Sequence, residues 1–341
     1  MSLDPSVLSQ TDVSIRWSRY TRREKKVSMV RAFVFPGQGA QAVGMGKELA
    51  QAFCDAREVF EEVDEALKQN LMRLMFEGPE DELTLTENAQ PALMAMSLAV
   101  MRVLARQGNV EVAKTCRFVA GHSLGEYSAL AAAGGLAIGD AALLLKRRGL
   151  AMQAAVPVGE GAMAALLGLD LDEVRAIARD AAEGDVCEAA NDNAPGQVVV
   201  SGTRAAVERA VTLAGERGAR RSILLPVSAP FHCALMAPAA EVMEDALSDA
   251  VLQTLSVPLI SNVSAEAVSD VDEIRRLLVE QVTAMVRWRE SVLYMKESGV
   301  EELVEIGVGA VLTGLTRRID SDLSRVAVGT PAGIESFLKT L

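Results

Sequence analysis

Short apolar runs of strand length alternate with longer amphipathic segments of helical period along most of the chain. Arg31–Phe35 and Arg117–Ala120 are two such runs, and each ends at a glycine-containing turn that leads into a helical pattern. Repetition of strand, sharp turn and helix predicts a parallel β-sheet covered by helices. Further strands of this sheet are expected at 258–262 and 303–306, and helices over 45–60, 71–76 and 91–106.

The middle of the chain has a different order of elements. We expect strands over 162–167, 186–190, 197–201 and 223–227, helices over 170–182 and 205–217, and a turn over 191–196. This order, βαββαβ, is that of a ferredoxin-like domain. The predicted fold class is therefore α/β. It combines an α/β-hydrolase-like large domain with a parallel sheet, formed by 29–155 and 228–341, and an inserted ferredoxin-like small domain over 156–227.

Residues 1–28 form a basic leader with six basic and three acidic side chains and without the apolar core of a secretory signal, so we expect it to lie outside the fold. The whole chain has 34 basic and 46 acidic side chains, a formal charge of -12. This balance argues against bulk attraction to nucleic acid or to an anionic membrane. The longest charge-free stretch, 222–240, contains three prolines and is unlike a membrane span, so we expect a cytoplasmic protein.

One five-residue segment, Gly121-His-Ser-Leu-Gly125, matches the pattern G-x-S-x-G. Its glycines allow a serine to occupy a strained turn between a strand and a helix, with the hydroxyl exposed at the carboxyl end of the sheet. The simpler interpretation is a glycine-bordered turn whose serine caps the helix. The flanking apolar strand and alanine-rich helix favour a nucleophile at Ser123.

A serine nucleophile needs a base, and the chain has only two histidines. His122 is adjacent to Ser123, and neighbouring side chains at a sharp turn usually diverge. His232 lies in a proline-stiffened loop after a predicted strand, so it is the candidate base, although a loop histidine is usually an ordinary polar residue. We find no convincing acid partner for it in the sequence.

Three basic residues, Lys146, Arg147 and Arg148, follow an apolar helical stretch. In one interpretation they form a charged helix end that complements the helix dipole. In the other, one of the two arginines points inward and binds a substrate carboxylate with two hydrogen bonds. Periodicity does not choose between Arg147 and Arg148. The four cysteines include no C-x-x-C pair, so neither a disulfide framework nor a metal site is predicted.

Five motifs occur in a fixed order: Phe35-Pro-Gly-Gln-Gly-Ala-Gln41, Gly121-His-Ser-Leu-Gly-Glu-Tyr127, Arg148-Gly-Leu-Ala-Met-Gln153, Asn193-Ala-Pro-Gly-Gln197 and Pro230-Phe-His-Cys-Ala-Leu-Met236. With these motifs the chain resembles the malonyl-CoA:acyl carrier protein transacylase family of type II fatty acid synthesis. The resemblance runs from about Val30 to the C-terminus. A single G-x-S-x-G is not specific, whereas five ordered motifs are.

The resemblance implies that Ser123 is the nucleophile and His232 the general base. It implies that the backbone N–H groups of Gln38 and Leu124 form an oxyanion hole. It also implies that the main-chain carbonyl of Gln281 orients the histidine, which replaces the acid of a triad. Without the resemblance, Gln281 would be interpreted as an exposed helical glutamine.

The resemblance further assigns Arg148 to the malonyl carboxylate. Phe231 is similar to a bulky residue that disfavours a methyl branch in malonyl-selective members. The sequence departs from the family pattern at Ala40, where serine is frequent, and at Met285, where proline often stands. The second departure bears on the placement of Gln281.

The expected activity is transfer of a malonyl group from malonyl-CoA to the pantetheine thiol of acyl carrier protein through a malonyl-serine ester. No cofactor or metal is expected, because one thioester replaces another. The partners expected are acyl carrier protein and a coenzyme A thioester, with neither nucleic acid nor membrane, and the enzyme is expected to be a monomer. The alternatives are a polyketide acyltransferase acting in trans, a serine esterase on the same Ser-His elbow, and a non-catalytic carrier-binding module.

Overall fold

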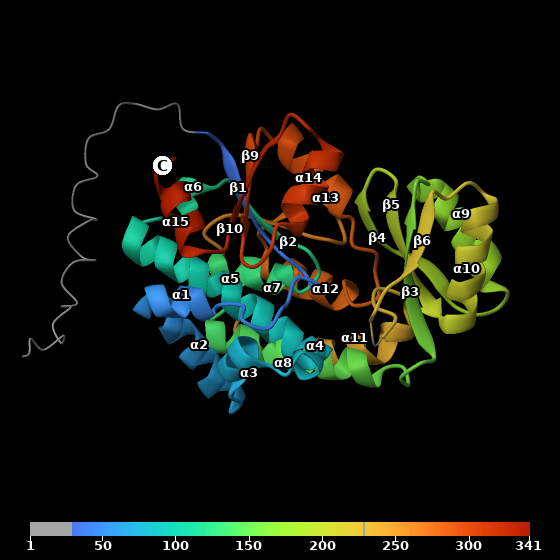
Figure 1. Ribbon diagram of the computed structural model, residues 1–341, viewed down its shortest axis with the longest axis horizontal. Helices are drawn as coiled ribbons and strands as arrows, with labels where there is room; N and C mark the ends of the chain where they lie inside the picture. Colours follow the sequence, from blue (N-terminus) through green and yellow to red (C-terminus); the bar gives the residue numbers. More distant parts are fainter. Residues whose placement is uncertain (1–28, 228) are drawn as a thin grey trace, which may run out of the picture.

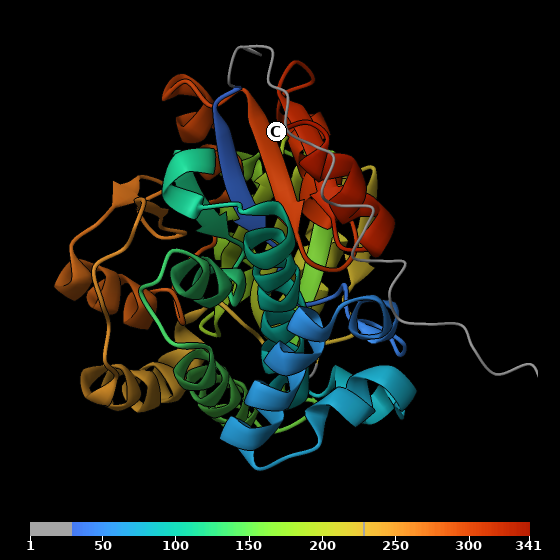
Figure 2. The ribbon, with the colours of Figure 1, turned by 90° about the vertical axis from the view of Figure 1, so that its left-hand side faces the viewer.

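The computed structural model describes residues 29–227 and 229–341, so the basic leader over 1–28 lies outside the described residues. Its larger sheet has the strand order β10-β9-β1-β2-β7-β8. All neighbouring strands are parallel except the pair β7 and β8. The strands are β1 (Arg31–Phe35), β2 (Phe118–Gly121), β7 (Leu259–Ile260), β8 (Ala267–Val268), β9 (Glu302–Ile306) and β10 (Ser324–Val328). Figure 2 shows β1 and β9 side by side in this sheet.

The central strands β1 and β2 are buried throughout, which explains why they are nearly continuous apolar runs. In β1, Phe33 and Phe35 enter one core cluster, whereas Ala32 and Val34 enter another. The first cluster is covered by helices that include α2 (Cys54–Leu67), α5 (Thr86–Gly108), α7 (Gly125–Ala132), α8 (Ile138–Ala154), α11 (Ala237–Asp249), α12 (Val271–Glu280) and α15 (Pro331–Leu338). The second is covered by α13 (Trp288–Glu297) and α14 (Val311–Ile319).

The smaller sheet is antiparallel and has the strand order β4-β5-β3-β6. Its strands are β3 (Gly161–Leu167), β4 (Cys187–Ala194), β5 (Gln197–Thr203) and β6 (Arg221–Leu224), with helices α9 (Leu171–Ala182) and α10 (Arg204–Glu216) between them. Alternate residues of β3 face opposite sides: Ala164 and Leu166 pack with α9 and α10, whereas Met163 and Ala165 join the large core. Figure 1 shows this unit to one side of the larger sheet. The predicted fold class is confirmed.

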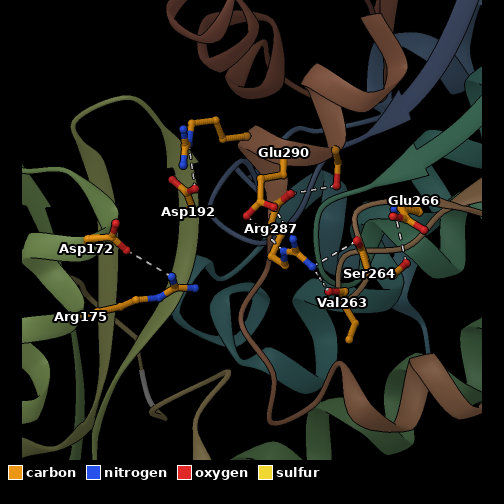
Figure 3. Close-up of polar contacts among 10 residues, drawn as sticks. Asp172, Arg175, Asp192, Val263, Ser264, Glu266, Arg287 and Glu290 are labelled. Atoms are coloured by element: carbon orange, nitrogen blue, oxygen red, sulfur yellow. Dashed lines mark hydrogen bonds and ion pairs between the residues drawn. The ribbon is translucent and has the colours of Figure 1, made fainter. Parts of the chain in front are cut away.

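Strand β4 connects the smaller sheet to the large domain. The Asp192 N–H donates to the Val286 carbonyl at 2.9 Å, and the Val286 N–H donates to the Ala190 carbonyl at 2.9 Å. The Asp192 carboxylate, which is 1% exposed, also accepts a hydrogen bond from Arg289 Nε at 2.8 Å. Figure 3 shows Asp192 on β4 across this junction from Glu290 on α13, whose carboxylate is directed towards Arg287. Backbone and side-chain bonds therefore fix the smaller sheet against α13 and the segment that leads into it.

Three predicted elements differ from the structure. The helix expected over 45–60 is two helices, α1 (Lys47–Ala52) and α2, because Phe53 between them is extended, with φ -135° and ψ 121°. Helix α5 begins at Thr86 rather than at Pro91, and Pro91 lies inside it, in its second turn. The turn expected over 191–196 is mostly strand, since two register shifts and the bonds to Val286 keep β4 paired through Ala194.

Short helices complete the described chain: α3 (Leu71–Glu77), α4 (Glu80–Thr84) and α6 (Val112–Thr115). Within residues 29–227 and 229–341, no helix is both long and apolar enough to cross a membrane.

Candidate active site

Ser123 lies at the tight turn that joins β2 to α7. Its φ of 52° is in the left-handed region, which non-glycine residues rarely adopt, so the turn holds the serine in a strained conformation. The two motif glycines make this turn possible. A Cβ on Gly121 would lie 1.9 Å from the carbonyl carbon of Gly125, and a Cβ on Gly125 would lie 2.3 Å from the Phe35 carbonyl oxygen. Close backbone packing therefore requires glycine at both ends of the G-x-S-x-G pattern.

His232 reaches the serine from the loop that follows β6. Its Nε2 lies 2.8 Å from Ser123 Oγ, and its Nδ1 lies 2.9 Å from the main-chain carbonyl oxygen of Gln281. Gln281 is at the C-terminal end of α12, where carbonyl groups have no partner within the helix. His232 also has a positive φ, 59°, so both members of the pair lie on strained backbone. Burial, followed by the charge of Arg148, lowers the pKa of His232 to about 3, so the imidazole is neutral at physiological pH.

Arg148 is the third side chain at the serine hydroxyl. It is only 1% exposed, whereas Arg147 is exposed, so the structure decides between the two arginines. The Nη2 group donates to Ser123 Oγ at 3.1 Å and to Gln281 Oε1 at 2.8 Å, and Nη1 donates to Gln90 Oε1 at 2.8 Å. Its Nε is buried and has no partner among the described residues. Burial lowers the pKa of this guanidinium. The result is a buried cation hydrogen-bonded to neutral groups beside the nucleophile.

Two backbone N–H groups near the serine are available to a ligand. Neither the N–H of Gln38 nor that of Leu124 donates a hydrogen bond to another residue in the described parts of the chain. Leu124 follows the serine at the start of α7, where the helix dipole is positive. Gln38 lies in the loop after β1, and its side chain is near Thr86 Oγ1, at 3.4 Å. Unpaired N–H groups at a helix start are suited to bind an oxyanion.

The other predicted residues have clear positions. The ring of His122 points away from the serine hydroxyl, because its Nε2 lies 2.8 Å from Asn193 Oδ1 on β4. Phe231, next to His232, packs into the main core and is largely buried. Gln281 is fully buried and is not the exposed glutamine that the helical pattern alone suggests. Its carbonyl contacts His232 although Met285 stands where proline is frequent in the family.

Sequence reasoning did not identify three further polar residues around this site. Gln90 belongs to the buried helix α5 and accepts from Arg148. Glu126 and Asn262 contact each other, since the Asn262 N–H donates to Glu126 Oε1 at 2.8 Å. The available signals were a glutamine and a glutamate in otherwise apolar helices, and an asparagine directly after a strand of the parallel sheet. In such sheets, ligands bind beyond the carboxyl ends of the strands.

The chain is similar to known acyltransferases over most of its length. A family model described as an acyl transferase domain matches residues 32–330. A malonyl CoA-acyl carrier protein transacylase of Bacillus subtilis is 46% identical over 311 residues, which are 91% of this chain and 96% of the relative. The crystal structure of an acyl-carrier-protein S-malonyltransferase from Bartonella henselae is 56% identical and has a TM-score of 0.90, covering 92% of this chain and 99% of that chain.

A further solved structure contains a carrier protein. It is a malonyl-transacylase in complex with the acyl carrier protein of a type II polyketide synthase, and it is 42% identical to this chain, with a TM-score of 0.89. The similarity covers 92% of this chain and 100% of that one.

Proposed function

The chain belongs to the acyl transferase family, and within it to the malonyl-CoA:acyl carrier protein transacylases. On this premise we propose how its residues perform malonyl transfer. It is an acyltransferase that moves a malonyl group from malonyl-CoA to acyl carrier protein, supplying fatty acid or polyketide synthesis. The predicted family is confirmed. The roles of the individual residues, given below, are our proposal.

In the first half-reaction, Ser123 Oγ attacks the thioester carbonyl carbon and transfers its proton to His232 Nε2, 2.8 Å away. The negative charge that develops on the carbonyl oxygen is bound by the N–H groups of Gln38 and Leu124. The carbon–sulfur bond then breaks, CoA leaves with the proton from His232, and a malonyl ester remains on the serine. The Gln281 carbonyl holds the imidazole with Nδ1 protonated and Nε2 free to accept the proton.

Arg148 selects the acyl group. Its Nη2 is 3.1 Å from Ser123 Oγ. The cation is therefore close enough to bind a carboxylate that a single carbon separates from the reacting carbonyl. Malonyl has this length. Acetyl has no carboxylate and would leave the buried guanidinium without a hydrogen-bonded anion, and a buried charge that lacks such a partner is unfavourable. This short distance is the observation that most directly supports malonyl as the acyl group.

In the second half-reaction, His232 deprotonates the pantetheine thiol of the carrier protein, and the sulfur attacks the ester carbonyl. The bond to Ser123 Oγ then breaks, and the serine takes back the proton from His232. The sum of the two steps exchanges one thioester for another, so the proposed mechanism needs no cofactor. We place the reaction in the cytoplasm, where CoA thioesters are available, and propose that a monomer suffices because all the named groups come from one chain. Phe231, beside the base, is proposed to limit branching of the acyl chain.

The proposal is tested by mixing the protein with malonyl-CoA and measuring its intact mass. We expect the mass to rise by one malonyl group, and Ser123→Ala to prevent this. Malonyl-enzyme in Ser123→Ala would show that the nucleophile is wrong. A serine esterase would instead turn over p-nitrophenyl esters without any thiol acceptor. A polyketide acyltransferase that acts in trans would be distinguished from a fatty acid synthesis enzyme by comparing the rates of malonyl transfer to several carrier proteins.

A further inference from the structure

Glu126 is a buried acid that the mechanism above does not use. It lies in the first turn of α7, three residues after Ser123, and is 1% exposed. Its two carboxylate oxygens are bound in two different directions. Oε1 accepts from the Asn262 backbone N–H at 2.8 Å, and Oε2 accepts from Nε2 of the Gln281 side chain. Because a buried carboxylate is costly, a position that retains one between two donors suggests a role in arranging them.

The first direction leads to the strained turn. Asn262 Oδ1 accepts the Ser123 N–H at 2.7 Å, and Asn262 Nδ2 donates to the Gly121 carbonyl at 2.7 Å. One asparagine side chain therefore holds the backbone on both sides of His122, and its own backbone is held by Glu126. These bonds stabilise the left-handed conformation at Ser123, which would otherwise cost free energy.

The second direction leads to the carboxylate-binding arginine. Gln281 Nε2 donates to Glu126 and also to the Ser123 carbonyl, at 3.0 Å, while Gln281 Oε1 accepts from Arg148 Nη2 at 2.8 Å. The two ends of an amide have opposite hydrogen-bonding roles. If the amide were reversed, its NH2 group would face the guanidinium donor and its oxygen would face the carboxylate. Glu126, together with the Ser123 carbonyl and the Arg148 guanidinium, makes the observed orientation the favourable one.

We propose that Glu126 is a positioning residue that holds the nucleophile turn through Asn262 and the malonyl-binding arginine through the Gln281 amide. This inference rests on the proposed function, because it assigns Arg148 to the acyl carboxylate. It makes one carboxylate the common support of two separate parts of the site. A shift of this group would therefore affect both the reactivity of the serine and the preference for malonyl.

The hydrogen-bond partners of Glu126 favour its ionised form, whereas its burial favours the protonated form. Both of its hydrogen-bond partners are donors, so a proton on either oxygen would break one of the two bonds. The charged or titratable groups that face it are Arg148 on α8 and the Tyr127 phenol, whereas the α12 side chains against it are apolar. Burial is the largest effect and raises the pKa of Glu126 to about 8, even though the two donors and Arg148 lower it.

The test compares Glu126→Gln with Ser128→Ala in malonyl and acetyl loading of the enzyme. Glu126→Gln keeps the size of the side chain but removes the charge and places an NH2 group against a donor. We expect kcat/KM for malonyl loading to fall about 10- to 100-fold, the loss typical of one hydrogen bond to a charged group, and the preference for malonyl over acetyl to narrow. Ser128, also buried on α7, has a hydroxyl with no partner among the described residues, so Ser128→Ala should change neither quantity.

A double-mutant cycle separates positioning from general destabilisation. In a Gln281→Met background the amide is absent, so Glu126→Gln should cause little further loss of malonyl preference. Wild-type rate and preference in Glu126→Gln, or full additivity in the cycle, would overturn the proposal. If Glu126→Gln does not fold, Glu126→Asp decides, because a shorter carboxylate cannot reach both donors and should narrow the preference too. Failure of the wild-type enzyme to load malonyl would instead refute the proposed function.

Discussion

Replacement of Arg148 by alanine should remove malonyl selectivity while leaving acyl transfer itself intact. In the structure the guanidinium is buried and hydrogen-bonded to the side-chain oxygens of Gln90 and Gln281 and to the serine hydroxyl. None of these groups is an anion, and Nε has no partner within the described residues. A malonyl carboxylate would supply the missing negative charge, whereas an acetyl group would not.

The magnitude follows from the bonds that such a carboxylate would make. Each hydrogen bond between charged groups contributes ~1.5–3 kcal/mol, and a bidentate carboxylate makes two of them. After part of this is offset by desolvation, ~3–4 kcal/mol should remain, which corresponds to a loss of ~10²–10³ in kcat/KM for malonyl-CoA. Acetyl loading should change much less, because acetyl does not use the cation.

The assay is the rate of formation of labelled acyl-enzyme from malonyl-CoA and from acetyl-CoA, each at several concentrations. Arg147→Ala is the matched control, since this arginine precedes Arg148 on α8 but is exposed, and it should keep the wild-type ratio. If Arg148→Ala preferred malonyl-CoA as strongly as the wild type, Arg148 would not be the group that recognises the carboxylate.

Three further predictions concern folding and pH. Gly121→Ala should destabilise the protein by ~3 kcal/mol or more, because its Cβ would lie 1.9 Å from backbone, while Gly215→Ala in α10, with free space around it, should be neutral or stabilising in thermal unfolding. Because His232 has a folded pKa of about 3, below its unfolded value, stability should fall as the pH drops from 6.5 towards 3, and His232→Gln should weaken this slope in denaturant titrations. Asp192→Ala should lower the free energy of unfolding by ~1–3 kcal/mol, because the backbone bond to Val286 remains but Arg289 loses its carboxylate partner. An unchanged midpoint of unfolding would contradict this.

The elements that the sequence predicted correctly are those with a local cause. The strands before the turns, the order βαββαβ and the serine at the turn follow from short patterns of apolar residues and glycine. His232 was accessible to reasoning because histidine is scarce in this chain. These features need no knowledge of distant contacts.

The features that escaped prediction depend on contacts between distant segments. The buried arginine could not be chosen because three consecutive leucines, over 143–145, blur the apolar face of α8, and Leu143 is in fact half exposed. Glu126 and Asn262 are separated by more than a hundred residues, and only the adjacent strands β2 and β7 bring them together. Asn193, expected in a turn, belongs to β4 because pairing with another part of the chain extends the strand.

A backbone carbonyl, rather than an acid, orients His232, and the position of Arg148 gives a physical reason. Both side chains contact Ser123 Oγ, so a carboxylate behind the histidine would attract the guanidinium by a few kcal/mol and compete with the malonyl carboxylate. The neutral Gln281 carbonyl avoids this competition, but it leaves the base beside a cation that lowers the pKa of His232. A malonyl carboxylate that neutralises Arg148 should then raise the basicity of His232, and an acetyl group should not.

This coupling can be measured directly, because the chain has only two histidines and ¹⁵N labelling of histidine gives few signals. In Arg148→Ala the pKa of His232 should rise from its value in the wild type, since the charge that lowers it is gone. His122, whose pKa is lowered by burial and not by Arg148, serves as the internal control and should stay where it is. An unchanged His232 titration would mean that burial alone sets its basicity, and malonyl would then be selected by binding to Arg148 without any effect on the base.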